Sequence, residues 1–169
     1  KDTKQLNEAI QALQKIKAEF TSKFSHIKIE LINLQPEQTI DAKANEVTRP
    51  LGQALKITKT KFSPSAHKVL LMGHMDTVYP IDSSFQSCLQ IDINTLNGPG
   101  VADLKGGLVV MLKALETLEA SPYAENVEWE VFINPDEEIG SPGSQKLFPE
   151  LAASNDLALI YEPSLSDGS

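Results

Sequence analysis

The stretch Leu70–Val78 constrains the fold more than any other part of the chain, because it joins an apolar run to two polar side chains. The run Leu-Leu-Met is typical of a buried strand, and it ends at Gly73. His74 and Asp76 follow directly. Burying an imidazole and a carboxylate is unfavourable unless each has a partner, so the sequence predicts that other polar groups meet them.

Three later stretches supply carboxylates close to similar sheet-like runs. They are Gly98–Gly107 with Asp103, Asn134–Gly140 with Glu137 and Glu138, and Leu159–Pro163 with Glu162. Predicted strands alternate with predicted helices, which favours a doubly wound α/β sheet. Ligands of such sheets bind outside the carboxyl ends of the strands. We therefore expect the four stretches to converge on a metal site at that edge.

The pattern along the chain predicts the surrounding elements. Helices are expected at 2–24, 108–118 and 144–153, the last interrupted near Pro149. The first of them rests on an apolar stripe formed by Leu6, Ile10, Leu13, Ile16, Phe20 and Phe24. Strands are expected at 27–34, 55–62, 68–73, 89–96, 127–133 and 157–161, with 68–73, 127–133 and 157–161 buried. The stretch 36–50 is expected to be irregular, with a helical turn around 42–47.

Length and charge limit the class of protein. The 169 residues suffice for one domain with a sizeable core, and the net charge of -8 argues against a nucleic-acid or anionic membrane surface. No apolar run reaches the ~18 residues of a membrane span. Cys88 is the single cysteine, so no disulfide framework exists, and we expect a cytoplasmic protein. Because the chain begins at Lys1 rather than Met, a periplasmic or secreted location stays open.

The residue types suit a metal-assisted hydrolysis. A neutral imidazole such as His74 is a good zinc ligand, and it usually gives its other N–H to a carboxylate, for which Asp76 is the candidate. Asp103, in a glycine-rich turn, could bridge two cations, and Glu138 and Glu162 offer further oxygen ligands. Glu137 could take a proton from a metal-bound water.

Each motif alone also has an ordinary structural explanation. An Asp-Glu-Glu run is usually a solvated loop, and a glycine-rich turn before a helix is more often a phosphate loop or a plain turn. The stretch around Gly98 lacks the spacing of dinucleotide-binding loops, and Lys105 is not part of a Gly-Lys-Ser/Thr sequence. No Gly-x-Ser-x-Gly stretch is present, which disfavours a serine hydrolase. Five carboxylates and a histidine near the ends of sheet-like runs together favour a metal site.

These motifs, in this order from about Lys68 to the end, resemble the glutamate carboxypeptidase and aminoacylase family of di-zinc peptidases. The resemblance rests on Gly73–Val78, Gly98–Gly107, Asp136–Ser141 and Tyr161–Pro163. It implies a three-layer αβα sandwich with a mostly parallel central sheet, of the zinc-exopeptidase kind. It also implies that His74 and Glu162 bind one zinc, that Glu138 binds the other, and that Asp103 bridges them, with the Asp103–Leu104 peptide bond cis. Asp76 would orient His74, and Glu137 would be the general base that activates a water bridging the two ions.

The implied activity is metal-dependent hydrolysis of a peptide or N-acyl amino acid amide bond, carboxypeptidase-like, with release of C-terminal glutamate as the narrower expectation. Zinc is the implied cofactor, with cobalt or manganese as alternatives. A small peptide or N-acyl amino acid would be the partner, and the full-length form would be a homodimer. The competing hypothesis is a non-catalytic metal-binding or assembly module.

One departure from the family pattern bears on the domain organisation. Family members are longer, and they carry a further histidine ligand and a lid or dimerisation domain. The other histidines here, His26 and His67, lie in predicted turns and are expected to face solvent. Residues 1–169 are therefore expected to be the N-terminal portion of a catalytic domain, with a sheet edge or apolar face left uncovered.

Overall fold

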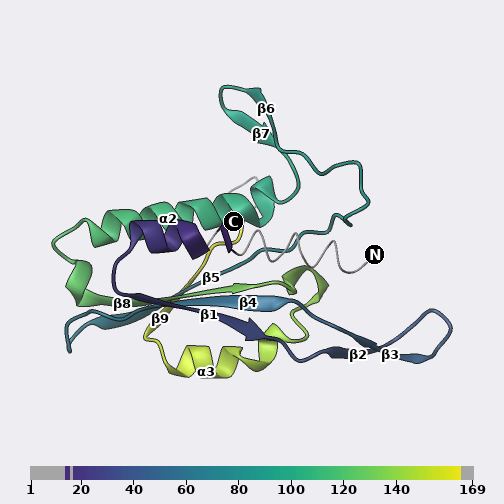
Figure 1. Cartoon of the computed structure of the whole chain (residues 1–169), viewed down its shortest axis with the longest axis horizontal. Coiled ribbons are helices and arrows are strands. Elements are labelled where there is room, and N and C mark those ends of the chain that lie inside the picture. The colour runs from purple at the N-terminus through teal and green to yellow at the C-terminus, as the bar shows by residue number, and fades with distance from the viewer. Residues whose placement is uncertain (1–13, 16, 165–169) are drawn as a thin grey trace.

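The computed structural model describes residues 14, 15 and 17–164, and a five-stranded sheet forms its centre in the order β1-β4-β8-β5-β9 (Figure 1). The strands are β1 (Ile27–Asn33), β4 (Gln53–Lys59), β5 (His67–His74), β8 (Val127–Asn134) and β9 (Leu157–Ile160). β8 pairs with β5, and β5 with β9, in parallel, while β4 pairs antiparallel with both β1 and β8. Only β4 in this sheet therefore runs against the others, and the predicted mostly parallel sheet is confirmed.

Helices cover both faces of the sheet, which gives the expected three layers. Helix α2 (Gly106–Glu119) and the N-terminal helix (residues 14, 15 and 17–23 described) lie on one face, and α3 (Phe148–Ala153) lies on the other (Figure 1). Alternate strand residues point to opposite faces. Leu71, Val131 and Ile133 therefore join the core under α2, while Leu70 and Phe132 join the core over α3.

The glycine-rich turn before α2 packs tightly against the end of β5. Gly100 adopts a left-handed conformation with φ of 73°, which favours glycine. A Cβ on Gly73 would lie 2.8 Å from a Leu108 methyl carbon and 3.0 Å from one of Leu104. The lack of a side chain at Gly73 thus lets the start of α2 approach the strand that carries His74.

Two predicted segments, 36–50 and 89–96, form short hairpins in place of the expected structure. The stretch 36–50 is a hairpin of β2 (Glu37–Ile40) and β3 (Glu46–Arg49), with no helical turn at 42–47. Its turn is stabilised by the Asp41 carboxylate, which accepts hydrogen bonds from the backbone N–H groups of Lys43 and Asn45.

The predicted strand 89–96 is likewise two strands. β6 (Leu89–Asp92) and β7 (Thr95–Asn97) form a hairpin that projects from the body of the molecule (Figure 1). The chain reverses between Asp92 and Thr95, where the Asp92 carboxylate accepts from the backbone N–H of Asn94.

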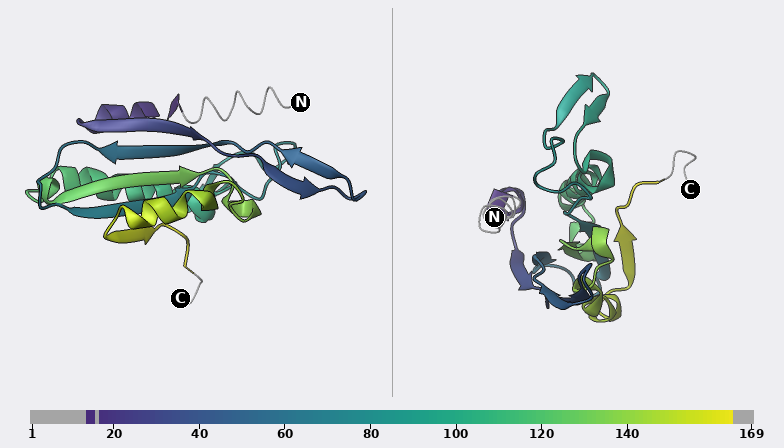
Figure 2. Two further views of the ribbon diagram at one scale, coloured as in Figure 1. Left: turned by 90° about the horizontal axis from the view of Figure 1, so that it is seen from below. Right: turned by 90° about the vertical axis from the view of Figure 1, so that its right-hand side faces the viewer.

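The C-terminal elements differ from expectation in burial rather than in position. The predicted helix 144–153 is a single turn at Ser144–Lys146 followed by α3, and Pro149 lies in the first turn of α3 rather than interrupting it. The predicted buried strand at 157–161 is exposed instead, because β9 is an edge strand with an uncovered side (Figure 2).

The predicted first helix is described only in part. Leu6, Ile10, Leu13 and Ile16 of its apolar stripe lie outside the described residues. Phe20 and Phe24 are buried as expected, and the Phe24 ring packs edge-on against Trp129 of β8, which is also buried. Within the described part of the chain, no helix is both long and apolar enough to cross a membrane.

Candidate metal centre

Three adjacent parallel strands bring the polar residues to one edge of the sheet. His74 is the last residue of β5, and it is paired in register with Asn134, the last residue of β8. The backbone pairing continues past the strand ends. After β5, Met75 donates its N–H to Asn134 O of β8 at 2.9 Å, and after β9, Tyr161 donates its N–H to Met72 O of β5 at 3.0 Å. The segments after β8 and β9 therefore start beside His74.

The His74 side chain is buried, with 1% of its surface exposed. Its Nε2 lies 2.8 Å from Asp103 Oδ1, and 3.8 Å from one oxygen each of Glu137 and Glu162. Ligand atoms of His74, Asp103 and Glu162 all lie within 4.8 Å of one another. The structure therefore brings together these predicted ligands, which come from three separate parts of the sequence.

Asp76 contacts the other nitrogen of the same ring. His74 Nδ1 lies 3.2 Å from the backbone carbonyl oxygen of Asp76 and 3.3 Å from its Oδ1. The two Asp76 carboxylate oxygens also accept hydrogen bonds from the backbone N–H groups of Glu137, at 3.3 Å, and Glu138, at 3.0 Å. Asp76 thus connects His74 with the loop after β8, and a proton on Nδ1 leaves Nε2 free to bind a metal.

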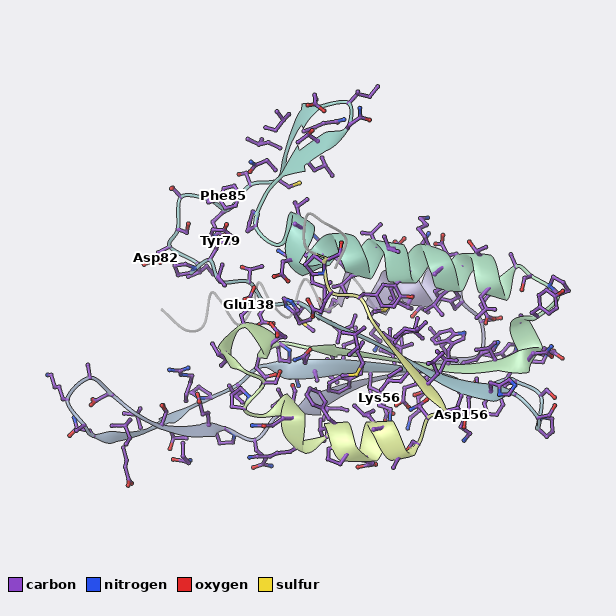
Figure 3. All side chains as sticks on the ribbon, turned by 180° about the vertical axis from the view of Figure 1, so that it is seen from behind. Lys56, Tyr79, Asp82, Phe85, Glu138 and Asp156 are labelled. Carbon is purple, nitrogen blue, oxygen red and sulfur yellow. The ribbon has the colours of Figure 1, made fainter. Side chains whose placement is uncertain are left out.

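Glu137 and Glu138 lie in a turn of 3-10 helix, Glu137–Ile139. Their side chains nevertheless have different surroundings. Glu137 is exposed and reaches His74 Nε2, whereas Glu138 is partly buried and lies close enough to Asp103 for their charges to interact. Figure 3 shows Glu138 on this loop.

Asp103 precedes the cis peptide bond Asp103–Leu104, as the resemblance implied. Leu104 is buried with 1% of its surface exposed, while the Asp103 carboxylate remains accessible. Lys105 donates from Nζ to Pro99 O at 3.0 Å, which closes the glycine-rich turn. The turn therefore anchors Leu104 in the core and presents Asp103 to His74.

The concentration of carboxylates alters the acidity of the cluster. Burial raises the pKa of Glu138 and of Glu162, and the negative charge of Asp103 raises both further. Burial opposes the charged form of His74, but its hydrogen bond with Asp103 and the charges of Asp76 and Glu162 outweigh that effect and raise its pKa. Like charges are thus gathered where a cation would relieve their repulsion.

The donor set fits a divalent metal. One imidazole nitrogen and two carboxylate oxygens from His74, Asp103 and Glu162 are the ligand types of catalytic zinc sites, which keep a position open for water or substrate. Glu138 does not belong to that group of three ligand atoms. It lies beside Asp103, where it could serve a second ion.

Two residues outside the cluster behave as expected, and one important residue was missed. His26 and His67 are exposed as expected, although His67 is the first residue of β5 and does not lie in a turn. The sequence places Asp136 in an acidic loop, yet it is 1% exposed and accepts hydrogen bonds from the far end of that loop. Residue type alone could not separate it from Glu137 and Glu138, because burial is what distinguishes them.

Sequence comparison defines the class of protein. The model of peptidase family M20/M25/M40 matches residues 70–169, which are more than half of the chain and include every residue of the cluster. The chain belongs to this family.

Individual relatives agree with that assignment. The chain is 39% identical over 95 residues to carboxypeptidase G2 of Pseudomonas sp. (strain RS-16), a match that covers 56% of this chain and 23% of that protein. The predicted resemblance to carboxypeptidases of this family is therefore confirmed.

Solved structures share the fold. Human carnosine dipeptidase 1 matches with a TM-score of 0.61 and 19% identity over 82% of this chain and 30% of its own. The di-peptidase Dug1p of Saccharomyces cerevisiae gives 0.64 and 18% over 88% of this chain and 32% of its own. The M20 family metallo-carboxypeptidase Sso-CP2 of Sulfolobus solfataricus gives 0.52 and 18% over 80% and 30%. The chain thus spans less than a third of the length of the relatives it matches.

Proposed function

We propose that this chain forms part of a metal-dependent hydrolase that cleaves the amide bond of a small peptide or an N-acyl amino acid. The observation that carries the proposal is the cluster of His74 Nε2, Asp103 and Glu162 at the carboxyl edge of the sheet. Membership of the peptidase family and the similarity to a carboxypeptidase support the same reaction class.

The metal centre would be held by His74 and Glu162 on one side, Glu138 on the other, and Asp103 between them. Zinc is the proposed ion, with two ions in the complete protein. Bound zinc would polarise the amide carbonyl and lower the pKa of a water molecule towards ~7.

The proton steps belong to residues of this chain. Glu137 is exposed, and its carboxylate reaches to 3.8 Å from His74 Nε2, so it can accept a proton from an attacking water at the cluster. The same group can then return the proton to the leaving amine. Asp76 holds the His74 ring by its Nδ1 side and does not meet substrate.

Narrower features of the function extend the same proposal. Release of a C-terminal residue is proposed in keeping with the carboxypeptidase relative. Glutamate is the residue that we propose is released. We also propose that the complete protein forms a homodimer and that it resides in a reducing compartment such as the cytoplasm.

The test combines zinc titration of this chain with hydrolysis assays on the complete protein. Calorimetry is expected to detect zinc binding that His74→Ala abolishes and His67→Ala, at an exposed histidine, preserves. The complete protein is expected to hydrolyse dipeptides or N-acyl amino acids and to lose activity in chelator. Zinc binding without hydrolysis by the complete protein would instead favour a non-catalytic metal-binding module.

A further inference from the structure

Asp136 is a buried carboxylate that the reaction itself does not use. It follows β8 by two residues, and only 1% of its surface is exposed. Oδ2 accepts hydrogen bonds from the backbone N–H groups of Gly143, at 2.8 Å, and Ser144, at 3.1 Å. Oδ1 accepts from the Ser144 hydroxyl and, at 3.5 Å, from Asn134 Nδ2. A carboxylate so deeply buried requires donors of this kind, because its desolvation is otherwise costly.

Gly143 and Ser144 lie at the far end of the loop that contains Glu137 and Glu138. The backbone of the loop closes in the same direction, since Ser141 donates its N–H to Asp136 O at 2.7 Å and Gly140 donates to Glu137 O at 2.7 Å. Asp136 therefore binds the residues 141–144 through both its carboxylate and its carbonyl oxygen. The segment between, which carries the proposed base and one proposed ligand, is held as a closed loop.

The closed loop points two N–H groups at Asp76, beside the metal centre. Glu137 and Glu138 both donate from the backbone to the Asp76 carboxylate, and Asp76 in turn contacts His74 Nδ1. A path of direct contacts therefore runs from the Asp136 side of the loop to the ring that is expected to bind metal. Asp136 has no place in the ligand cluster itself.

We propose that Asp136 is a positioning residue for the metal centre. Its carboxylate fixes the loop so that Glu137 and Glu138 present their backbone N–H groups to Asp76 and their side chains to the cluster. The role rests on the proposed function, because the residues it positions are the proposed base and a proposed ligand. Substitution of a residue that only stabilised the fold would instead accelerate amide exchange throughout the sheet.

Asp136→Asn is the principal variant, because it keeps the shape of the side chain but sets an amide N–H₂ against donors. Ser144→Ala is the milder one, since it removes a single donor and preserves the carboxylate. Glu119→Gln is the matched control. Glu119 also belongs to a partly buried polar network, accepting from Lys59 Nζ at 2.7 Å and Trp129 Nε1 at 2.8 Å. It is the last residue of α2, whereas the metal centre lies near the first.

The first measurement is amide hydrogen exchange of the metal-free chain by NMR. Asp136→Asn is expected to accelerate exchange at the Glu137 and Glu138 amides by about tenfold or more relative to the Val131 amide of β8. Ser144→Ala is expected to act in the same direction with a smaller effect. Glu119→Gln is expected to leave the ratio unchanged.

The second measurement is the zinc Kd of the same proteins. Residues that support metal ligands typically change metal affinity ~10–100-fold when substituted. Asp136→Asn is expected to weaken zinc binding by about this factor, and Glu119→Gln is expected to preserve it even if the unfolding midpoint falls.

The outcomes distinguish the positioning role of Asp136 from the zinc binding on which the proposed function rests. Unchanged exchange at Glu137 and Glu138 in both variants, or equal acceleration at all amides, overturns the positioning role. Faster local exchange with an unchanged zinc Kd overturns it too. If the unsubstituted chain binds no zinc, metal binding by this chain is refuted, while the exchange comparison still decides whether Asp136 positions the loop.

Discussion

The Asp76 carboxylate accepts a hydrogen bond from the backbone N–H of Glu138, with Oδ2 and N 3.0 Å apart. This contact joins the segment after β5 to the segment after β8, beyond the point where the strands themselves are paired. A side chain at the end of one strand thereby sets the position of a neighbouring loop. The expected consequences of this arrangement can be measured one residue at a time.

Asp76→Asn is expected to weaken zinc binding by this chain ~10–100-fold. The substitution removes the negative charge beside His74 Nδ1 and replaces an oxygen that accepts from the loop. Calorimetric titration provides the measurement, with Asp82→Asn in an exposed loop as the control (Figure 3). A Kd equal to that of the control would contradict the orienting role.

Glu137→Gln is expected to reduce turnover of the complete protein by ~10²-fold or more while zinc affinity stays nearly the same. The glutamine keeps the size of the side chain but cannot accept the proton. Activity assays and zinc titration on the same preparation separate the two effects. Near-normal turnover would show that Glu137 is not the base.

Gly107→Ala is expected to destabilise the chain by ~1–3 kcal/mol and to weaken zinc binding. An added Cβ would collide with the backbone carbonyl oxygen of Tyr161, so the segment that carries Glu162 has to move. Gly73→Ala is the comparison, because the atoms nearest its Cβ would be side-chain methyl carbons of Leu108, Leu104 and Met111, which can move further than a backbone oxygen can. Urea unfolding and zinc titration should rank Gly107→Ala as the more damaging change.

Self-association through β9 is expected at high concentration. Leu157, Leu159 and Ile160 are 54%, 43% and 64% exposed on a strand whose outer edge has no partner among the described residues (Figure 2). Exposed apolar edges pair readily with other strands. Light scattering should detect oligomers that Leu159→Lys reduces, and a monomer at all concentrations would contradict the expectation.

The β2–β3 hairpin is expected to lose stability in acid. Hydrogen bonds from the Asn45 side chain and from the backbone of Asn45 and Lys43 lower the pKa of Asp41. A carboxyl whose pKa is lowered by folding contributes stability above its unfolded pKa, and this contribution is lost as the pH falls through the folded pKa. NMR titration of the Asp41 carboxyl should give a midpoint below that of an unfolded aspartate, and Asp41→Asn should loosen the turn already at neutral pH.

The parts predicted correctly from the sequence are those where periodicity and polarity agree. Leu70–Gly73 followed by His74 indicated a buried strand with a polar residue at its end, and Glu162 likewise follows an expected strand, although that strand is exposed. The parallel pairing of β8, β5 and β9 then brought these ends together, as the rule for α/β sheets requires.

The predictions that failed depend on information that a local pattern does not contain. Leu157–Ile160 has the composition of a buried strand, and its exposure follows from its place at the sheet edge. The hairpins at 37–49 and 89–97 depend on turns at Asp41 and Asp92, whose side chains bond to nearby backbone N–H groups. The role of Asp136 depends on donors that are seven and eight residues further along the chain.

The strand order has a consequence for the sequence of events during synthesis. β8 lies between β4 and β5, although it leaves the ribosome after both of them. The two earlier strands cannot reach their final places until Asn134 has been made, and Glu162 emerges later still. The group of His74, Asp103 and Glu162 therefore cannot assemble before β9 has been made, so an ion bound there would stabilise strands that have already paired rather than start their pairing.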